Sequence, residues 1–578
     1  MVYGSKFVIE YMSNFSFKNK SLYWVFGLML MAMTIRLKFH LNGNYLLAGV
    51  DGPYYPLQVR SLMDKFRLGI SDMPLLFMLE AALAFIFKML FRGSLNESIL
   101  IAVKFVDIVI PPCAAIPVYL LCREFNLNKK QTNYPCYLMV GYSILNFTTV
   151  LLFSNNFQKN AVAVVFIFFY LYFVFRILKY FQKKDVYYAA FILLCCTLTH
   201  FGSAAILFFI TIIILLSYAL TNRQFIRAMN GRRTYILFIP VILFLSALLF
   251  FDSTRFERFI NLPIRLFESP VILMMLDGQN IADYFNPINF FIPNLLAILA
   301  VFLFIRLGKT IKKEVKIFGL SLLIAIFILT SPLIGIEWAN RLYMMSYVPI
   351  VIVYLILFSE ITQRWLIALP VFIFCSLISI VVIRGYASPM LQSISNSAYN
   401  EFKLLKNKAI LGENTVIVAR QDLRILGSWE FRTKGVASYL LTKNDFLQFD
   451  AVFFLTQKEG INYTQEPLGA KLKIPANSIR VFQGDFFDLY KVNSLDKNNY
   501  VTGIRPLAAG IIINLEKDSF ALQNKITGKT KTIIICKNTI FHLLTPNSKL
   551  AEGMNVEIWG KGIPFSLNLN AQTIVESK

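Results

Sequence analysis

The chain has 578 residues, of which 57% are hydrophobic and 15% aromatic, and its mean hydropathy is +0.59. Only 16% of the residues are charged, against about 25% in a typical soluble domain, although the net charge is +24. These values exclude a disordered chain, a collagen-like chain, a disulfide scaffold and a single soluble domain, and they indicate a polytopic membrane protein.

Apolar runs long enough to cross a membrane fill residues 1–384 and do not occur in residues 385–578. A transmembrane helix needs about 20 such residues. The runs predict eleven spans, at 22–39, 100–122, 134–153, 161–178, 186–201, 204–220, 235–252, 289–305, 317–335, 343–358 and 365–384. A further run at 74–91 contains Glu80 and Lys88, and we interpret it as an amphipathic helix at the membrane interface.

The distribution of Lys and Arg predicts that the N-terminus lies inside. With this orientation the inside segments 1–20, 123–133, 176–185, 221–234, 306–316 and 359–364 together carry 20 Lys and Arg. The short outside loops carry only Lys159 and Arg341, and cytoplasmic loops show such an excess. The basic charge therefore reflects topology and does not indicate nucleic-acid binding. Residues 385–578 are predicted to lie outside the cytoplasm, and the protein in the plasma (inner) membrane.

The part after the membrane domain (1–384) divides by pattern into two modules. Residues 385–498 are predicted to form an α/β domain, with a helix at 391–408 and buried strands at 415–419 and 450–455. Residues 499–578 are predicted to form a small β-rich module, a partly closed barrel. Its short strands are expected at 509–515, 531–536, 539–544, 555–560 and 565–569.

Seven cysteines are present, but only Cys536 lies in the part after residue 384, and no C-x-x-C pair occurs. Neither an internal disulfide in that part nor a zinc or redox site is therefore expected. Within the second span, Lys104 and Asp107 are three residues apart. This spacing places them on one helix face and predicts a structural ion pair.

The long first outside loop, from about 40 to 99, contains the sequence D-G-P-Y-Y at 51–55. Gly52 and Pro53 predict a turn that holds the Asp51 carboxylate near the membrane surface. Tyr54 and Tyr55 suit an interfacial position. By itself this composition favours a solvated turn aspartate.

The surrounding layout resembles the GT-C superfamily of membrane glycosyltransferases, which use polyprenyl-phosphate sugars. Oligosaccharyltransferases, protein O-mannosyltransferases and lipid A aminoarabinose transferases belong to it. The matching features are an acidic residue in the first outside loop (Asp51), a D-x-P-L-like motif at Asp72–Leu75, an odd span count and a C-terminal domain outside. The resemblance covers residues 20 to 385 in layout. It implies a lipid-linked sugar donor and an extracytoplasmic acceptor.

The sequence departs from the family at S-N-N-F-Q-K-N, residues 154–160, where many members carry a second acidic motif. Here Asn155, Asn156 and Gln158 stand in place of carboxylates. Members that bind a divalent metal use carboxylates from both loops, since hard cations prefer charged oxygen ligands. We therefore expect a metal-free mechanism without a cofactor, in which Lys159 offsets donor phosphate charge. The alternative is an ordinary polar loop tip.

Two more outside segments carry candidate donor-binding residues. His200, in L-T-H-F-G, is an interfacial polar residue, a contact to the lipid phosphate or a proton carrier. In E-W-A-N-R-L-Y the resemblance implies that Arg341 faces the donor phosphate, which a guanidinium binds through two hydrogen bonds; a headgroup anchor is the alternative. Glu337 either pairs with Arg341 or supplies the missing second acid. Asn340 belongs to the same segment.

The sequence thus predicts a polyprenyl-phosphate-dependent glycosyltransferase with Asp51 as general base. Tyr54, Tyr55, Asp72, Asn156, Gln158 and Lys159 are predicted to contribute to donor or substrate binding, together with His200, Glu337, Asn340 and Arg341. The acceptor is a protein, a glycolipid or a glycan.

Two alternatives remain. One is a transporter or flippase for a lipid-linked solute, although the sequence shows no repeated halves. The other is a non-catalytic membrane scaffold.

Overall fold

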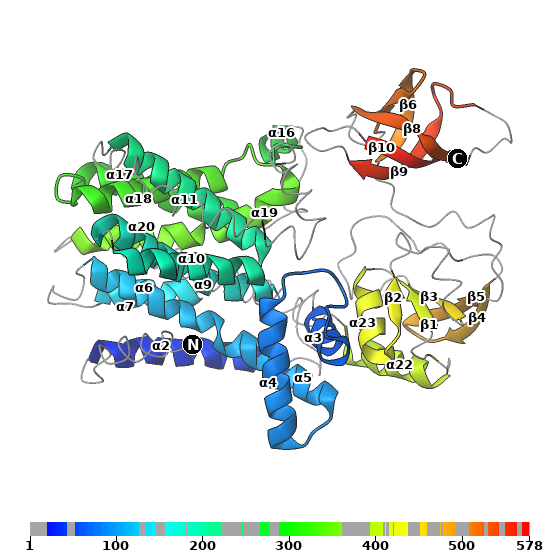
Figure 1. Ribbon diagram of the computed structural model, residues 1–578, viewed down its shortest axis with the longest axis horizontal. Helices are drawn as coiled ribbons and strands as arrows, with labels where there is room; N and C mark the ends of the chain where they lie inside the picture. Colours follow the sequence, from blue (N-terminus) through cyan, green and yellow to red (C-terminus); the bar gives the residue numbers. More distant parts are fainter. Residues whose placement is uncertain are drawn as a thin grey trace. The chain divides into compact units, whose positions relative to one another are not determined.

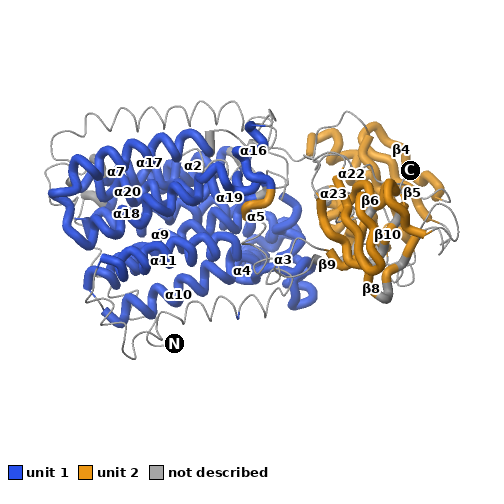
Figure 2. Tube along the Cα trace, turned by 90° about the horizontal axis from the view of Figure 1, so that it is seen from above, with its two compact units in different colours: residues 1–253, 269–393 blue, residues 254–268, 394–578 orange. Residues whose placement is uncertain are grey.

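The structure, a computed structural model, describes residues 20–42, 52–125, 134–145, 157–180, 182–221, 246, 266–276, 288–360, 394–408, 411, 415–419, 421–436, 451–458, 474, 478–492, 508–524, 530–542, 549–562 and 569–576. The chain forms two compact units (Figure 2). Unit 1 comprises residues 1–253 and 269–393, and unit 2 comprises residues 254–268 and 394–578.

Unit 1 is helical (Figure 1). Its helices are α2 (Lys20–Asn42), α3 (Tyr54–Lys65), α4 (Leu75–Phe91), α5 (Leu95–Val109), α6 (Ala115–Glu124), α7 (Tyr134–Leu145), α9 (Gln158–Tyr180), α10 (Lys183–Thr199), α11 (Phe201–Thr221), α16 (Val271–Leu276), α17 (Ile288–Leu307), α18 (Lys313–Leu329), α19 (Ile336–Met345) and α20 (Tyr347–Glu360). Helix α20 packs against α7, α17 and α18. The apolar stretch Trp338–Ser359 is 94% buried, so this stretch forms the core of the bundle.

Five helical stretches among the described residues are long and apolar enough to cross a membrane. They are Leu95–Glu124, Gln158–Tyr180, Phe201–Thr221, Phe290–Leu307 and Trp338–Ser359. Helices occupy nine of the eleven predicted spans, whereas those at 235–252 and 365–384 lie almost wholly outside the described residues. The protein is therefore built as an integral membrane protein. The count of eleven and the inside N-terminus stay predictions.

Prolines divide or end the helices where the sequence predicted continuous spans. Pro111 and Pro112 form a 3₁₀ turn, Pro111–Ala114, between α5 and α6. Pro332 follows the end of α18, so this helix stops short of the predicted residue 335. Proline has no backbone N–H to donate, and its ring clashes with the preceding turn. The hydropathy pattern does not show where a proline interrupts a helix. For this reason the observed helix ends differ from the ends of the predicted spans.

Residues 52–92, the described part of the predicted first outside loop before α5, contain the helices α3 and α4, of which only α4 was predicted. Helix α4 coincides with the predicted amphipathic helix at 74–91, and it runs across the direction of α2 (Figure 1). Helix α3 directly follows the D-G-P turn and was not predicted. Phe66 and Arg92 end α3 and α4 in the left-handed conformation, with φ of 52° and 51°. This is a common way to end a helix.

Unit 2 contains a mixed five-stranded sheet in the order β2-β1-β3-β5-β4. Its strands are β1 (Thr415–Val418), β2 (Lys434–Val436), β3 (Ala451–Gln457), β4 (Ser478–Gln483) and β5 (Phe487–Val492). Strand β1 pairs in parallel with β2 and β3, and the remaining pairs are antiparallel. The unit also contains helices α22 (Asn396–Lys408) and α23 (Gln421–Phe431). The helix predicted at 391–408 is α22, which begins at Asn396 and buries Ala398, Phe402 and Leu405.

The other sheet of unit 2 is a closed barrel in the order β10-β8-β7-β6-β9. Its strands are β6 (Ala508–Leu515), β7 (Ser519–Gln523), β8 (Thr530–His542), β9 (Asn555–Gly562) and β10 (Leu569–Glu576). Two predicted strands, at 531–536 and 539–544, form the one strand β8. The Thr539 hydroxyl accepts a hydrogen bond from the Cys536 N–H and donates one to the Ala571 carbonyl, at the irregularity between β8 and β10.

Candidate functional site

The described part of the site begins at the first turn of α3. Pro53 precedes the helix, and its carbonyl accepts the Leu57 N–H at 3.2 Å. Tyr54 and Tyr55 are therefore the first two residues of the helix, and their ring centroids lie 5.4 Å apart. Phe77 of α4 lies 5.8 Å from the Tyr54 ring and 6.1 Å from the Tyr55 ring. The three rings form one wall.

Asp72 lies at the centre of the polar groups beside this wall. The side chain is buried, and its Oδ1 accepts the Met73 N–H at 2.8 Å. Its Oδ2 accepts hydrogen bonds from the Tyr54 hydroxyl and from the Lys159 ammonium. A buried carboxylate is tolerated when its lone pairs are used in this way. Asp72 thus joins the first outside loop to the start of α9.

Gln58 holds the loop that carries Asp72 against α3. Its amide Nε2 donates to the Tyr54 hydroxyl at 3.0 Å and to the Ile70 carbonyl at 2.7 Å, and its Oε1 accepts the Ile70 N–H at 2.9 Å. A Cβ at Gly69 would lie 2.7 Å from the Ser61 hydroxyl, so a larger residue there would require the Ser61 side chain to move. Gln58 was not among the residues predicted from the sequence. Its position one turn after Tyr54 is the signal that was available.

Lys159 packs in the same wall. Its Nζ lies 5.0 Å from the centroid of the Tyr54 ring and 5.9 Å from that of Phe77, distances at which a cation is attracted to a ring face. Its backbone N–H donates to the Tyr55 hydroxyl at 3.4 Å. The Lys159 side chain keeps 14% of its surface exposed, whereas Asp72 has none. The cation is therefore the accessible member of the pair. Its contact with donor phosphate stays a prediction.

Gln158 points into the interior instead. Its side chain is fully buried, and Nε2 donates to Glu80 Oε1 at 2.8 Å and to the Val103 carbonyl at 3.0 Å. Burial raises the pKa of the Glu80 carboxyl well above its usual value, and the nearby Asp107 carboxylate raises that pKa further. Burial therefore favours the neutral form of the Glu80 carboxyl. Gln158 connects α9 to α4 and α5.

The predicted ion pair between Lys104 and Asp107 is wrong. Asp107 Oδ1 lies 3.5 Å from the Arg36 guanidinium, and Oδ2 lies 3.0 Å from His40 Nε2. Arg36 also donates to the Asp107 backbone carbonyl at 3.1 Å. Arg36 and His40 are one turn apart on α2 and reach Asp107 together. Arg36 lies within an apolar run, and this position could have drawn attention to it.

His200 connects two helices. Its backbone N–H donates to the Cys196 carbonyl at 2.9 Å at the end of α10, and its Nδ1 accepts the Ser203 N–H at 3.1 Å at the start of α11. Because Nδ1 accepts, the hydrogen-bond pattern assigns the ring proton to Nε2 in the neutral imidazole. The side chain is half-buried. His200 thus has a capping role, which does not conflict with a ligand contact through Nε2.

The remaining predicted residues are not joined to the Asp72–Lys159 pair by any described contact. Arg341 is exposed on α19 and makes no hydrogen bond or ion pair with the described residues, and Asn340 beside it is half-buried. Asp51, Asn156 and the Glu337 side chain lie outside the described residues. The convergence of Asp51, Asn156, His200 and Arg341 on one cavity stays a prediction. Among the described residues, no group of three His, Cys, Asp or Glu could hold a metal ion.

No family model matches the chain, and no curated protein matches it. Solved structures of an oligosaccharyltransferase are similar to it. The enzyme is that of Archaeoglobus fulgidus. Its structure with a tethered acceptor peptide has a TM-score of 0.45 at 12% identity, over 75% of this chain and 69% of that one. Its structure with an inhibitory peptide and a dolichol-phosphate has a TM-score of 0.39 at 14% identity, over 75% and 69%. The likeness concerns the fold and assigns no role to any residue.

Proposed function

We propose that the protein is a membrane glycosyltransferase that takes a sugar from a polyprenyl-phosphate-linked donor and transfers it to an extracytoplasmic acceptor. The observation that carries this proposal is the Asp72–Lys159 ion pair. It joins two segments that the sequence singled out independently, the first outside loop and residues 154–160, which include the start of α9. A partly exposed cation beside an aromatic wall suits a phosphate next to a sugar.

In this proposal the leaving group is the polyprenyl phosphate, whose negative charge Lys159 and Arg341 offset. Stabilising charge where it develops is a major source of catalysis. Asp72 and Tyr54 act as positioning residues, because they fix the Lys159 ammonium through hydrogen bonds. The acceptor nucleophile attacks the anomeric carbon from the face opposite the phosphate, so the anomeric centre inverts.

Asp51 takes the proton from the acceptor nucleophile in this scheme. It stands three residues before Tyr54, the first residue of α3. The sequence thus places a carboxylate directly before the wall that holds Lys159. With amides in the second loop, no second carboxylate is available there for a divalent metal, and the scheme uses none.

The test is an assay of the purified protein with radiolabelled polyprenyl-phosphate sugars. Asp51→Asn keeps the size of the side chain and removes the proton acceptor, so turnover should fall by a factor of about 100 or more with donor affinity unchanged. Asp64→Asn, at an exposed position of α3, is the matched control and should be fully active. A chelator should leave the wild type active. Loss of turnover with chelator and recovery with manganese would show that the metal-free scheme is wrong.

A further inference from the structure

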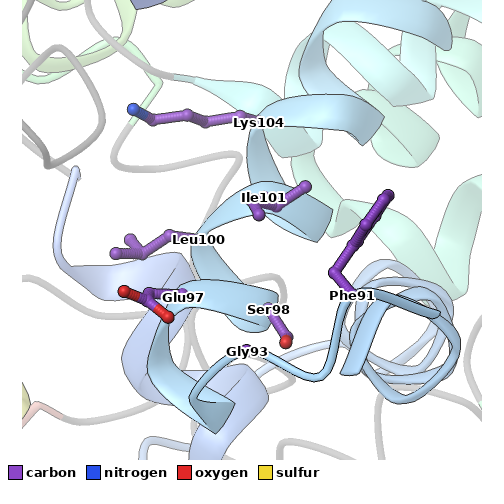
Figure 3. Close-up of a pocket in the computed structure, with 7 residues that line it drawn as sticks. All are labelled: Phe91, Gly93, Glu97, Ser98, Leu100, Ile101 and Lys104. Atoms are coloured by element: carbon purple, nitrogen blue, oxygen red, sulfur yellow. The ribbon is translucent and has the colours of Figure 1, made fainter. Parts of the chain in front are cut away.

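The α4–α5 hairpin carries a pocket that the proposed sugar transfer does not use. Its volume is 410 Å³, within the range of about 300–1,000 Å³ usual for ligand sites. The lining is mostly apolar, with Phe91 from the end of α4 and Leu100 and Ile101 from α5. Two charged residues of α5, Glu97 and Lys104, complete it (Figure 3).

Lys104 has no ion-pair partner among the described residues. It lies within the apolar stretch Leu95–Glu124, is half-buried, and makes no hydrogen bond or ion pair with the described residues. Asp107, the nearest acidic residue along the helix, pairs with Arg36 and His40 instead. A charge at such a position is costly unless it meets a counter-charge, and it marks a candidate site.

Glu97 supplies the opposite charge at the other end of the pocket. It closes a capping box, in which its Oε2 accepts the Ser94 N–H at 3.0 Å and its own N–H donates to the Ser94 hydroxyl at 3.3 Å. Its Oε1 makes no hydrogen bond with the described residues. Glu97, Leu100 and Lys104 project on the same side of α5 (Figure 3). Lys104 stands seven positions after Glu97, so their Cα atoms are about 10 Å apart along the helix axis.

The surface around the pocket is suited to acyl chains. Large apolar side chains are exposed on both helices of the hairpin, and they include Phe85, Met89, Leu90 and Phe91 on α4 and Ile101 and Phe105 on α5. Exposed apolar side chains on a helix that lies at the membrane interface contact lipid.

We propose that this pocket binds a zwitterionic membrane phospholipid that carries a primary ammonium group, with its phosphate on Lys104 and its ammonium on Glu97. The two residues stand about two helical turns apart on α5, and a phosphate and an ammonium joined by a two-carbon linker supply one opposite charge for each of them. A lipid with only negative charge satisfies Lys104 but faces the Glu97 carboxylate. A quaternary ammonium has no N–H to donate to Glu97. The headgroup that matches both ends is that of phosphatidylethanolamine.

The test uses the full-length protein in detergent and native mass spectrometry. The probes are phosphatidylethanolamine, phosphatidylglycerol and phosphatidylcholine with identical acyl chains. Wild type should retain phosphatidylethanolamine most strongly. Lys104→Gln should lower its retention about tenfold, since a charge-assisted contact is lost, and Lys104→Arg should keep it. Lys88→Gln, at an exposed position of α4 that does not line the pocket, is the matched control.

Glu97→Gln is the decisive variant, because glutamine also serves in a capping box and the helix start is preserved. It should abolish the preference for phosphatidylethanolamine over phosphatidylglycerol without preventing lipid binding. The Glu97→Gln comparison tests the proposal even if the Lys104→Gln variant does not fold. Equal or stronger retention of phosphatidylglycerol by the wild type would overturn the proposal, as would unchanged retention by Lys104→Gln.

Discussion

Two buried carboxylates of unit 1 have similar partners but contrasting surroundings. Asp107 pairs with Arg36, whose side chain is 6% exposed, and with His40, so that this cluster is sealed. Asp72 is equally buried, but its partner Lys159 keeps 14% of its surface exposed beside two aromatic rings. A sealed pair neutralises charge within the bundle, whereas a pair with an accessible cation can also meet a ligand. The difference separates a structural cluster from a candidate site.

The largest effect is expected from Asp107→Asn, which leaves the Arg36 guanidinium buried without its carboxylate. Breaking a buried pair from one side costs about 3–5 kcal/mol. The melting temperature in detergent should therefore fall sharply. Replacing both partners, as in Arg36→Met with Asp107→Leu, should be tolerated better than the single change. Equal melting temperatures for Asp107→Asn and wild type would show that the cluster is not structural.

Asp72→Asn should cost less stability, about 1–3 kcal/mol, because the Lys159 ammonium can reach water once its partner is lost. Turnover should nevertheless fall about tenfold or more, since Lys159 and Tyr54 lose their common acceptor. Melting temperature and turnover are measured on the same preparation. If stability fell as much as in Asp107→Asn while the remaining folded protein kept full turnover, both clusters would be structural.

Arg341→Gln should change donor binding alone. The side chain is exposed and makes no contact with the described residues that would support the fold. Donor affinity should fall about tenfold through the loss of a charge-assisted contact, with the melting temperature unchanged. Arg306→Gln, an exposed arginine in the last turn of α17, is the matched control. Unchanged donor affinity would restrict Arg341 to a role as headgroup anchor.

Glu80→Gln should have the smallest effect, within about 0.5 kcal/mol of wild type. Burial raises the pKa of the Glu80 carboxyl well above its usual value and so favours the neutral form, which glutamine resembles. The carbonyl oxygen of the new side chain can still accept from Gln158. Thermal unfolding at pH 7 measures this. A loss comparable to that of Asp107→Asn would show that Glu80 is ionised and belongs to the Asp107 cluster.

The sequence by itself determined the membrane class, most helices of unit 1 and the α22 helix of unit 2, because hydrophobic periodicity is a local property. It also singled out Asp72 and Lys159 as separate residues. Local pattern could not reveal that they pair with each other, because they are 87 residues apart. For the same reason the partner of Asp107 was mispredicted. Lys104 is its neighbour along the helix, but Arg36 and His40 reach Asp107 only when α2 packs against α5. Tertiary packing decides which charges meet, because a buried carboxylate is stabilised by the cation that the fold brings to it, whatever their separation in the chain.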